Sequence, residues 1–147
     1  MKKWFALVTF LSVLLISACN DDSDELSGKT FKITYPPVLE EDLDNPSKYH
    51  SIVRLKFSKG NTVSNTMDDT EGTLELNEDV LVFNFENKNE KLHVNFIDFK
   101  ESDKDFSSYS AVIGDSELHI EDSSQVKKLL KLSGDLSENM PVEFIEK

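Results

Sequence analysis

Cysteine is almost absent from this chain of 147 residues, which contains only Cys19. An intrachain disulfide and a multi-cysteine metal site are therefore excluded. Basic residues are also scarce, because 16 lysines and arginines stand against 28 aspartates and glutamates, and the formal net charge is −12. Without a cationic surplus the protein cannot replace the counterions of a phosphate backbone, so we expect no nucleic-acid partner.

The sequence also lacks a hydrophobic run long enough to span a membrane. Its longest run covers residues 4–16 and is interrupted only by Thr9 and Ser12, whereas a spanning helix needs about 20 residues. Lys2 and Lys3 precede the run and small residues follow it. This order is typical of a secretory signal peptide over residues 1–18.

The end of this leader, Leu15-Ile16-Ser17-Ala18-Cys19, resembles the lipobox of bacterial lipoproteins. The resemblance implies that the chain is cut between Ala18 and Cys19 and that Cys19, as the new N-terminus, carries a diacylglycerol. Two acyl chains are sufficient for stable membrane attachment, so the implied location is the extracytoplasmic face of the cell membrane. The alternative is an ordinary signal peptide followed by a chance cysteine. A composition rich in Lys, Asn, Asp and Ser and poor in Ala and Arg favours a Gram-positive source, while a Gram-negative source would add outer-membrane sorting.

The chain that follows is divided into a short tether and one domain. Removal of the leader would leave 14 basic and 28 acidic residues. Together with the lipidated Cys19, residues 20–27 are predicted to form an acidic, solvated tether over 19–27. Its eight residues would reach about 26–29 Å and hold the domain away from anionic lipid. Residues 28–147 are long enough for a single domain.

Short apolar alternations separated by turn residues recur about every ten residues in this domain. They predict a mainly β fold, an antiparallel meander that closes into a barrel or packs as a sandwich. Gly114-Asp115-Ser116 is interpreted as a turn, and Phe96 followed by Ile97 as a bulge or an exposed apolar contact. The expected strands lie at 30–35, 52–57, 62–67, 74–76, 80–85, 92–96, 109–113, 118–120 and 142–145.

One helix is expected near the C-terminus, where Val126, Leu129 and Leu130 recur at helical spacing. Residues 122–124 are its predicted N-cap and Gly134 its stop. The order of strands, late helix and final strand resembles lipocalin-like small β-barrels, and residues 28–31 stand where such domains often open with Gly-x-Trp. The resemblance implies a closed meander with an interior cavity and no specific ligand.

Two sets of residues are candidates for binding. Aromatic residues on the inward parity would line an interior cavity, and acidic residues after Pro36-Pro37 would form a partner surface. The first set is Phe83, Phe85, Phe96 and Tyr109, and the second is Glu40, Glu41, Asp42 and Asp44. Strand parity places His50, His93 and His119 outward, so we expect no metal site and no catalytic triad.

Catalytic signatures are missing from the sequence, which contains no Gly-x-Ser-x-Gly, His-Glu-x-x-His or phosphate-binding loop. We therefore expect a monomeric, non-enzymatic binding module without a cofactor, whose ligand is a small molecule or a cationic peptide, with an immunity-type role as one possibility. The alternative is an accessory protein that contacts a membrane transport, conjugation or phage-entry complex. A hollow interior would favour the first hypothesis and a packed interior the second.

Overall fold

The computed structural model describes residues 22–124 and 128–147, so the predicted leader and Cys19 lie outside the described residues. Each strand pairs antiparallel with the next, and the last pairs with the first to close an eight-stranded barrel. The predicted antiparallel meander is confirmed, and it closes as a barrel. Its strands are β1 (Thr30–Tyr35), β2 (His50–Ser58), β3 (Thr62–Asn65), β4 (Thr70–Asn77), β5 (Val80–Glu86), β6 (Glu90–Glu101), β7 (Tyr109–Ile120) and β8 (Pro141–Glu146).

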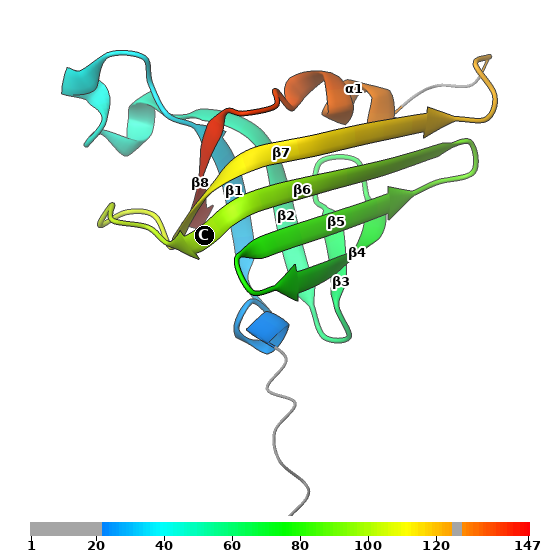
Figure 1. Ribbon diagram of the computed structural model, residues 1–147, viewed down its shortest axis with the longest axis horizontal. Coiled ribbons are helices and arrows are strands. Elements are labelled where there is room, and N and C mark those ends of the chain that lie inside the picture. Colours follow the sequence, from blue (N-terminus) through cyan, green and yellow to red (C-terminus); the bar gives the residue numbers. More distant parts are fainter. Residues whose placement is uncertain (1–21, 125–127) are drawn as a thin grey trace, which may run out of the picture.

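β7 is one continuous strand, so the turn predicted at Gly114-Asp115-Ser116 is wrong. β6 and β7 each contain 12 residues, and their pairing runs from Glu90 opposite Ile120 to Glu101 opposite Tyr109. β6 pairs with β7 on both sides of the predicted turn, with Val94 opposite Ser116 and Phe96 opposite Ile113, so a register shift stands where the turn was expected. This pairing outweighs the local turn propensity of the sequence. In Figure 1 the two strands run side by side as the longest arrows of the barrel.

The bulge predicted near Phe96 is present in β6. The register with β7 shifts between Ile97 and Lys100, and Asp98 has a positive φ of 55°. This irregularity lets Phe96 and Phe99, three positions apart, both face the core, with exposed fractions of 1% and 8%. Ile97 points the other way and is 42% exposed. The bulge and the exposed apolar side chain, which the sequence offered as alternatives, therefore occur together.

Short helices close the two ends of the barrel. The predicted C-terminal helix is confirmed as α1 (Lys128–Asp135), which ends one residue beyond the expected stop at Gly134. Figure 1 shows α1 at one end of the barrel and the 3-10 helix η1 (Asp22–Glu25) at the other. The connection between β1 and β2 contains two further 3-10 helices, η2 (Glu40–Asp42) and η3 (Pro46–Lys48).

The folded domain begins before Gly28. Leu26, directly after η1, is 2% exposed and belongs to the hydrophobic core. The N–H of Gly28 donates to the carbonyl of Phe57 at 2.9 Å, and the N–H of Lys29 donates to the carbonyl of Leu26 at 3.2 Å. Residues 22–27 are therefore part of the domain and not of the expected solvated tether, because burial of Leu26 fixes this segment against the barrel.

Candidate functional site

The aromatic residues predicted to line a cavity lie in the core of the barrel. Phe83, Phe85 and Phe96 are at most 2% exposed. The ring centroids of Phe83 and Phe96 are 5.2 Å apart, in an edge-to-face arrangement. Further ring contacts extend this set through Phe57, Phe31 and Phe144. Such centroid distances are those of aromatic rings in direct contact, so the rings fill the space between them.

Tyr109 lies at the edge of this aromatic core. Its ring stacks on Phe99 at a centroid distance of 4.9 Å and contacts the edge of Phe31 at 5.7 Å. The structure thus brings the four predicted residues into one cluster in which they contact other side chains. Leu129, Leu132 and Leu136 cover this core at the α1 end, and Leu26 covers it at the η1 end.

A groove of about 770 Å³ lies instead on the outer face of β4, β5, β6 and β7. Its outward side chains alternate with buried Phe85 and Leu92 along the strands. Two rows of polar residues cross the groove in register. The first row is Thr73, Asn84, His93 and Glu117, and the second is Glu86, Lys91 and His119.

Gly72 allows β4 and β5 to approach closely beside this groove. A Cβ atom at this position would lie 2.5 Å from the carbonyl oxygen of Asn84 and 2.8 Å from Cδ1 of Phe85. Real Cβ atoms do not approach backbone oxygen so closely, so only glycine fits here without a movement of the strands.

His93 is held in a defined orientation within the groove. Its Nδ1 lies 2.6 Å from Oδ1 of Asn84. Since an amide oxygen only accepts, Nδ1 is the donor in this contact. His119 lines the same groove from β7. The sequence placed both side chains outward but did not bring them together, because that requires the β6–β7 register.

The charges around the groove are mainly acidic. Glu71, Glu86 and Glu117 line it together with a single lysine, Lys91. The Nζ of Lys91 lies 3.2 Å from Oε1 of Glu86, and both side chains are more than half exposed. Two carboxylates therefore face the groove without being neutralised by this lysine, which suits a cationic ligand better than an anionic one.

The predicted acidic partner surface lies on the connection between β1 and β2. Glu40, Glu41 and Asp42 form η2, and Asp44 follows it. Next to them Val38 and Leu39 are 98% and 58% exposed. The segment therefore presents two apolar side chains beside a group of carboxylates.

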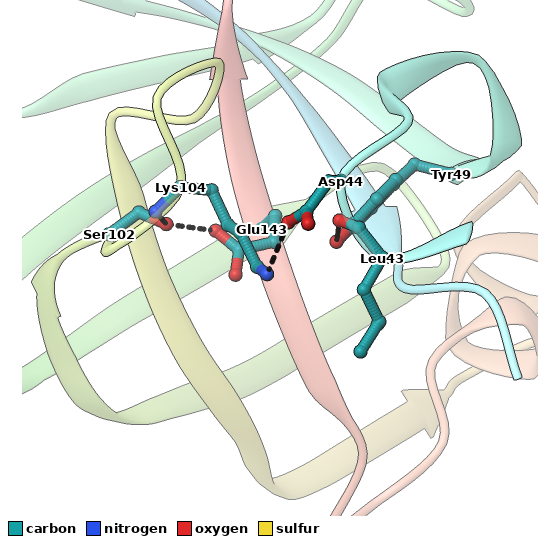
Figure 2. A network of polar contacts seen from close by, with 6 residues as sticks. All are labelled: Leu43, Asp44, Tyr49, Ser102, Lys104 and Glu143. Carbon is teal, nitrogen blue, oxygen red and sulfur yellow. Dashed lines mark hydrogen bonds and ion pairs between the residues drawn. The ribbon is translucent and has the colours of Figure 1, made fainter. Parts of the chain in front are cut away.

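Polar contacts hold this connection in place (Figure 2). The hydroxyl of Tyr49 donates to the carbonyl of Leu43 at 2.8 Å, and Nζ of Lys104 lies 3.2 Å from Oδ1 of Asp44. In the neighbouring β6–β7 loop, the hydroxyl of Ser102 donates to Oε2 of Glu143 at 2.7 Å. These contacts join the connection, the β6–β7 loop and β8 at one side of the barrel.

The same contacts shift two pKa values. Burial raises the pKa of the Tyr49 hydroxyl, and the nearby charge of Lys104 opposes this rise only in part. The hydrogen bond to Asp44 raises the pKa of the Lys104 ammonium. Tyr49 is therefore a neutral donor and Lys104 a cation at neutral pH.

Glu90 is a buried carboxylate that the sequence did not single out. It is 2% exposed and accepts the backbone N–H groups of Leu129 and Leu130 at 3.3 and 3.2 Å. The side chain of Asn87 donates to it at 2.8 Å. Burial opposes its ionisation, but these hydrogen bonds outweigh burial and lower its pKa.

The predicted cap of α1, residues 122–124, is followed by residues 125–127, which include Val126 and lie outside the described residues, so this cap stays a prediction. Within the predicted cap, Oδ1 of Asp122 accepts from the N–H and the hydroxyl of Ser124. In the described part of α1, the amides of Leu129 and Leu130 are bound by Glu90, which comes from β6. No sign of this role was visible in the sequence, because Glu90 follows Asn87, Lys88 and Asn89 and was interpreted with them as part of a turn.

Within residues 22–124 and 128–147, no three His, Cys, Asp or Glu side chains are placed to hold a metal ion. The same part of the chain contains no helix that is both long and apolar enough to cross a membrane.

Comparisons with known proteins found no matching family model, no similar curated protein and no similar solved structure.

Proposed function

We propose that this protein is an extracytoplasmic lipoprotein, anchored in the cell membrane by a diacylated Cys19, and that it acts as a non-enzymatic binding module. The leader sequence that ends in Leu15-Ile16-Ser17-Ala18-Cys19 supports the anchor. The barrel supports the binding role, because a rigid β framework can present strand faces and loops to a partner.

The binding surface proposed is the outer face of the barrel. The observation that carries this choice is the continuous contact of the core rings, from Phe57 through Phe83 and Phe96 to Phe144. A barrel that binds a small molecule inside needs space for it. The groove on β4–β7, by contrast, has a volume of about 770 Å³ and is open to solvent.

The proposed ligand of this groove is a cationic peptide. The mature chain would carry 14 basic and 28 acidic residues, and carboxylates outnumber lysines around the groove. A negative field of this kind raises the local concentration and the association rate of cations, and the effect weakens as salt increases.

The test is a titration of the full-length, lipidated protein in detergent with a fluorescent oligo-lysine peptide at low and at moderate salt. Glu117→Gln removes a carboxylate inside the groove. Glu75→Gln removes the same charge from an exposed position on β4 outside it. If the groove is the site, we expect Glu117→Gln to weaken binding about two- to fivefold, the size of an exposed ion pair, and Glu75→Gln to have a smaller effect.

Equal weakening by the two variants would mean that the peptide responds only to the net charge of the protein, and would overturn the groove as the site. Absence of binding at both salt concentrations would overturn the cationic ligand itself.

A second candidate function is supported by the packed interior, which favours it over a ligand held inside the barrel, and by the exposed pair Val38 and Leu39. Apolar side chains at 98% and 58% exposure on a loop held by hydrogen bonds suit contact with another protein. In this case the protein is an accessory subunit of a membrane transport, conjugation or phage-entry complex. A photo-crosslinking residue at position 39 should then give one discrete crosslinked product in living cells, whereas the same residue at position 97 should not.

A further inference from the structure

The way in which the N-terminal segment joins the barrel restricts how an anchored molecule can lie on a membrane. η1 contacts the barrel at β4, and Leu26 is buried in the core. Gly28 then continues the pairing of β1 with β2 by donating its N–H to the carbonyl of Phe57. The chain therefore enters the folded domain at Asp22, at the end of the barrel that η1 covers (Figure 1).

Only two residues separate Asp22 from Cys19 in the sequence. Three successive Cα–Cα steps reach at most about 11 Å, even when the chain is fully extended. The domain is longer than this distance in the direction that matters, because β1, which leads from η1 to residues 36–49 (Figure 1), has six residues and extends over about 20 Å at the usual rise of a strand. An anchor this short cannot let the molecule turn over on the membrane.

We propose that the η1 end of the barrel lies against the lipid bilayer and that the α1 end points away from it. This inference rests on the proposed lipidation of Cys19. The end facing the lipid includes η1 and the turns that connect β2 with β3 and β4 with β5. The end facing away carries α1 and residues 36–49, with the exposed pair Val38 and Leu39. A partner approaching from outside the cell would therefore meet this second end first.

The orientation is measurable with one fluorophore at a time. Cys19 is the only cysteine in the chain and lipidation would consume it, so an introduced cysteine is the single labelling site. Lys59→Cys places the label in the exposed β2–β3 turn, and Val38→Cys places it at the opposite end, where the side chain is 98% exposed. The full-length, lipidated variants are labelled and reconstituted in vesicles of phosphatidylcholine and phosphatidylglycerol that contain a headgroup-bound quencher. We expect quenching at position 59 to be at least twice that at position 38.

A lengthened tether is the matched control. Insertion of about twelve Gly and Ser residues between Asp21 and Asp22 gives a flexible linker that keeps the anchor but removes the restriction. The difference in quenching between the two positions should shrink, while flotation with the vesicles is unchanged.

The outcomes separate the two proposals. Equal quenching at both positions in a protein that floats with the vesicles would overturn the orientation and leave the anchor intact. Equal flotation of a Cys19→Ser chain would overturn the anchor, and with it the proposed function.

Discussion

At the scale of single residues, Glu90 shows how a buried charge can be stabilised by the ends of two elements. Its carboxylate lies at the start of β6 and accepts N–H groups of α1 together with the amide of Asn87. A carboxylate at a helix N-terminus is favoured by the orphan N–H groups and by the helix dipole. Glu90 therefore links the helix to the strand that it covers.

Glu90→Ala should lower the free energy of unfolding by about 1–3 kcal/mol, because it leaves buried N–H groups without an acceptor. Urea denaturation measures this change. Glu86→Ala is the control, since the Glu86 side chain is 68% exposed and loses only a surface ion pair worth less than about 1 kcal/mol. Equal losses in the two variants would contradict the capping role.

The stabilisation by Glu90 should also depend on pH. The folded protein lowers the pKa of this carboxyl from 4.5. Its contribution is therefore fully present at pH values above the unfolded pKa and is lost as the pH falls through the lower, folded pKa. The difference in unfolding free energy between the natural protein and Glu90→Gln should be constant at neutral pH and shrink below about pH 4.5. A difference that stays the same down to pH 3 would contradict this assignment.

Two glycines should respond in opposite ways to the same substitution. Gly72→Ala places a Cβ 2.5 Å from a backbone oxygen, so the strands must separate, and we expect a loss of about 1–3 kcal/mol. Gly134 lies in α1, where an added Cβ would meet no atom within 4 Å. Gly134→Ala should therefore stabilise the protein by up to about 1 kcal/mol. Thermal melts of the two variants measure both effects, and a neutral Gly72→Ala would contradict the close approach of β4 and β5.

At the scale of elements, the connection between β1 and β2 depends on contacts that reach across the chain. The ring of Tyr49 packs edge-to-face on Phe106 at 5.2 Å, and its hydroxyl binds the carbonyl of Leu43. The ordered 3-10 turns η2 and η3 are short and have little stability of their own. Their arrangement is therefore maintained by Tyr49 and by the ion pair between Lys104 and Asp44.

Tyr49→Phe should loosen this connection while the barrel remains folded. The variant loses one hydrogen bond, worth about 1 kcal/mol, but keeps the ring contact with Phe106. Hydrogen exchange of the amides of residues 39–45 should become faster, and exchange in β5 and β6 should not change. Uniform acceleration throughout the protein would show that Tyr49 supports the whole barrel and not this connection alone.

The sequence predicted the elements well where the pattern is local. Alternation identified the inward parity of Phe83 and Phe96, and helical spacing identified the helix that contains Leu129. The sequence did not predict the features that depend on pairing between strands. The continuity of β7 through Gly114 depends on the length of β6, and the groove around His93 and His119 depends on the register between these strands. Whether inward rings fill a barrel or line a cavity likewise depends on packing, which residue type alone does not determine.

At the scale of the whole molecule, a filled interior and two covered ends make the barrel one cooperative unit. The hydrophobic core is a single cluster that includes Leu26 at one end and Leu136 at the other. A substitution that leaves a cavity in the middle of this core should therefore lower the stability of the whole barrel.

Phe83→Ala should lower the free energy of unfolding by about 3–5 kcal/mol, because Phe83 is 1% exposed and its removal leaves a cavity. Phe106→Ala is a suitable control, since Phe106 contacts Tyr49 outside the main core. Chemical denaturation measures both variants. A loss below about 1 kcal/mol for Phe83→Ala would indicate that the interior is loosely packed and could accept a ligand.

The closure of the barrel by β8 has a consequence for biosynthesis. β8 consists of six residues and is the only strand that joins β1 to β7 in the described chain. Strands that precede β8 in the chain keep unsatisfied edges until β8 is available to pair, and unpaired edges invite aggregation. A premature stop codon even shortly before Pro141 would therefore yield a product that chaperones must hold and proteases remove, although almost the entire barrel has been synthesised.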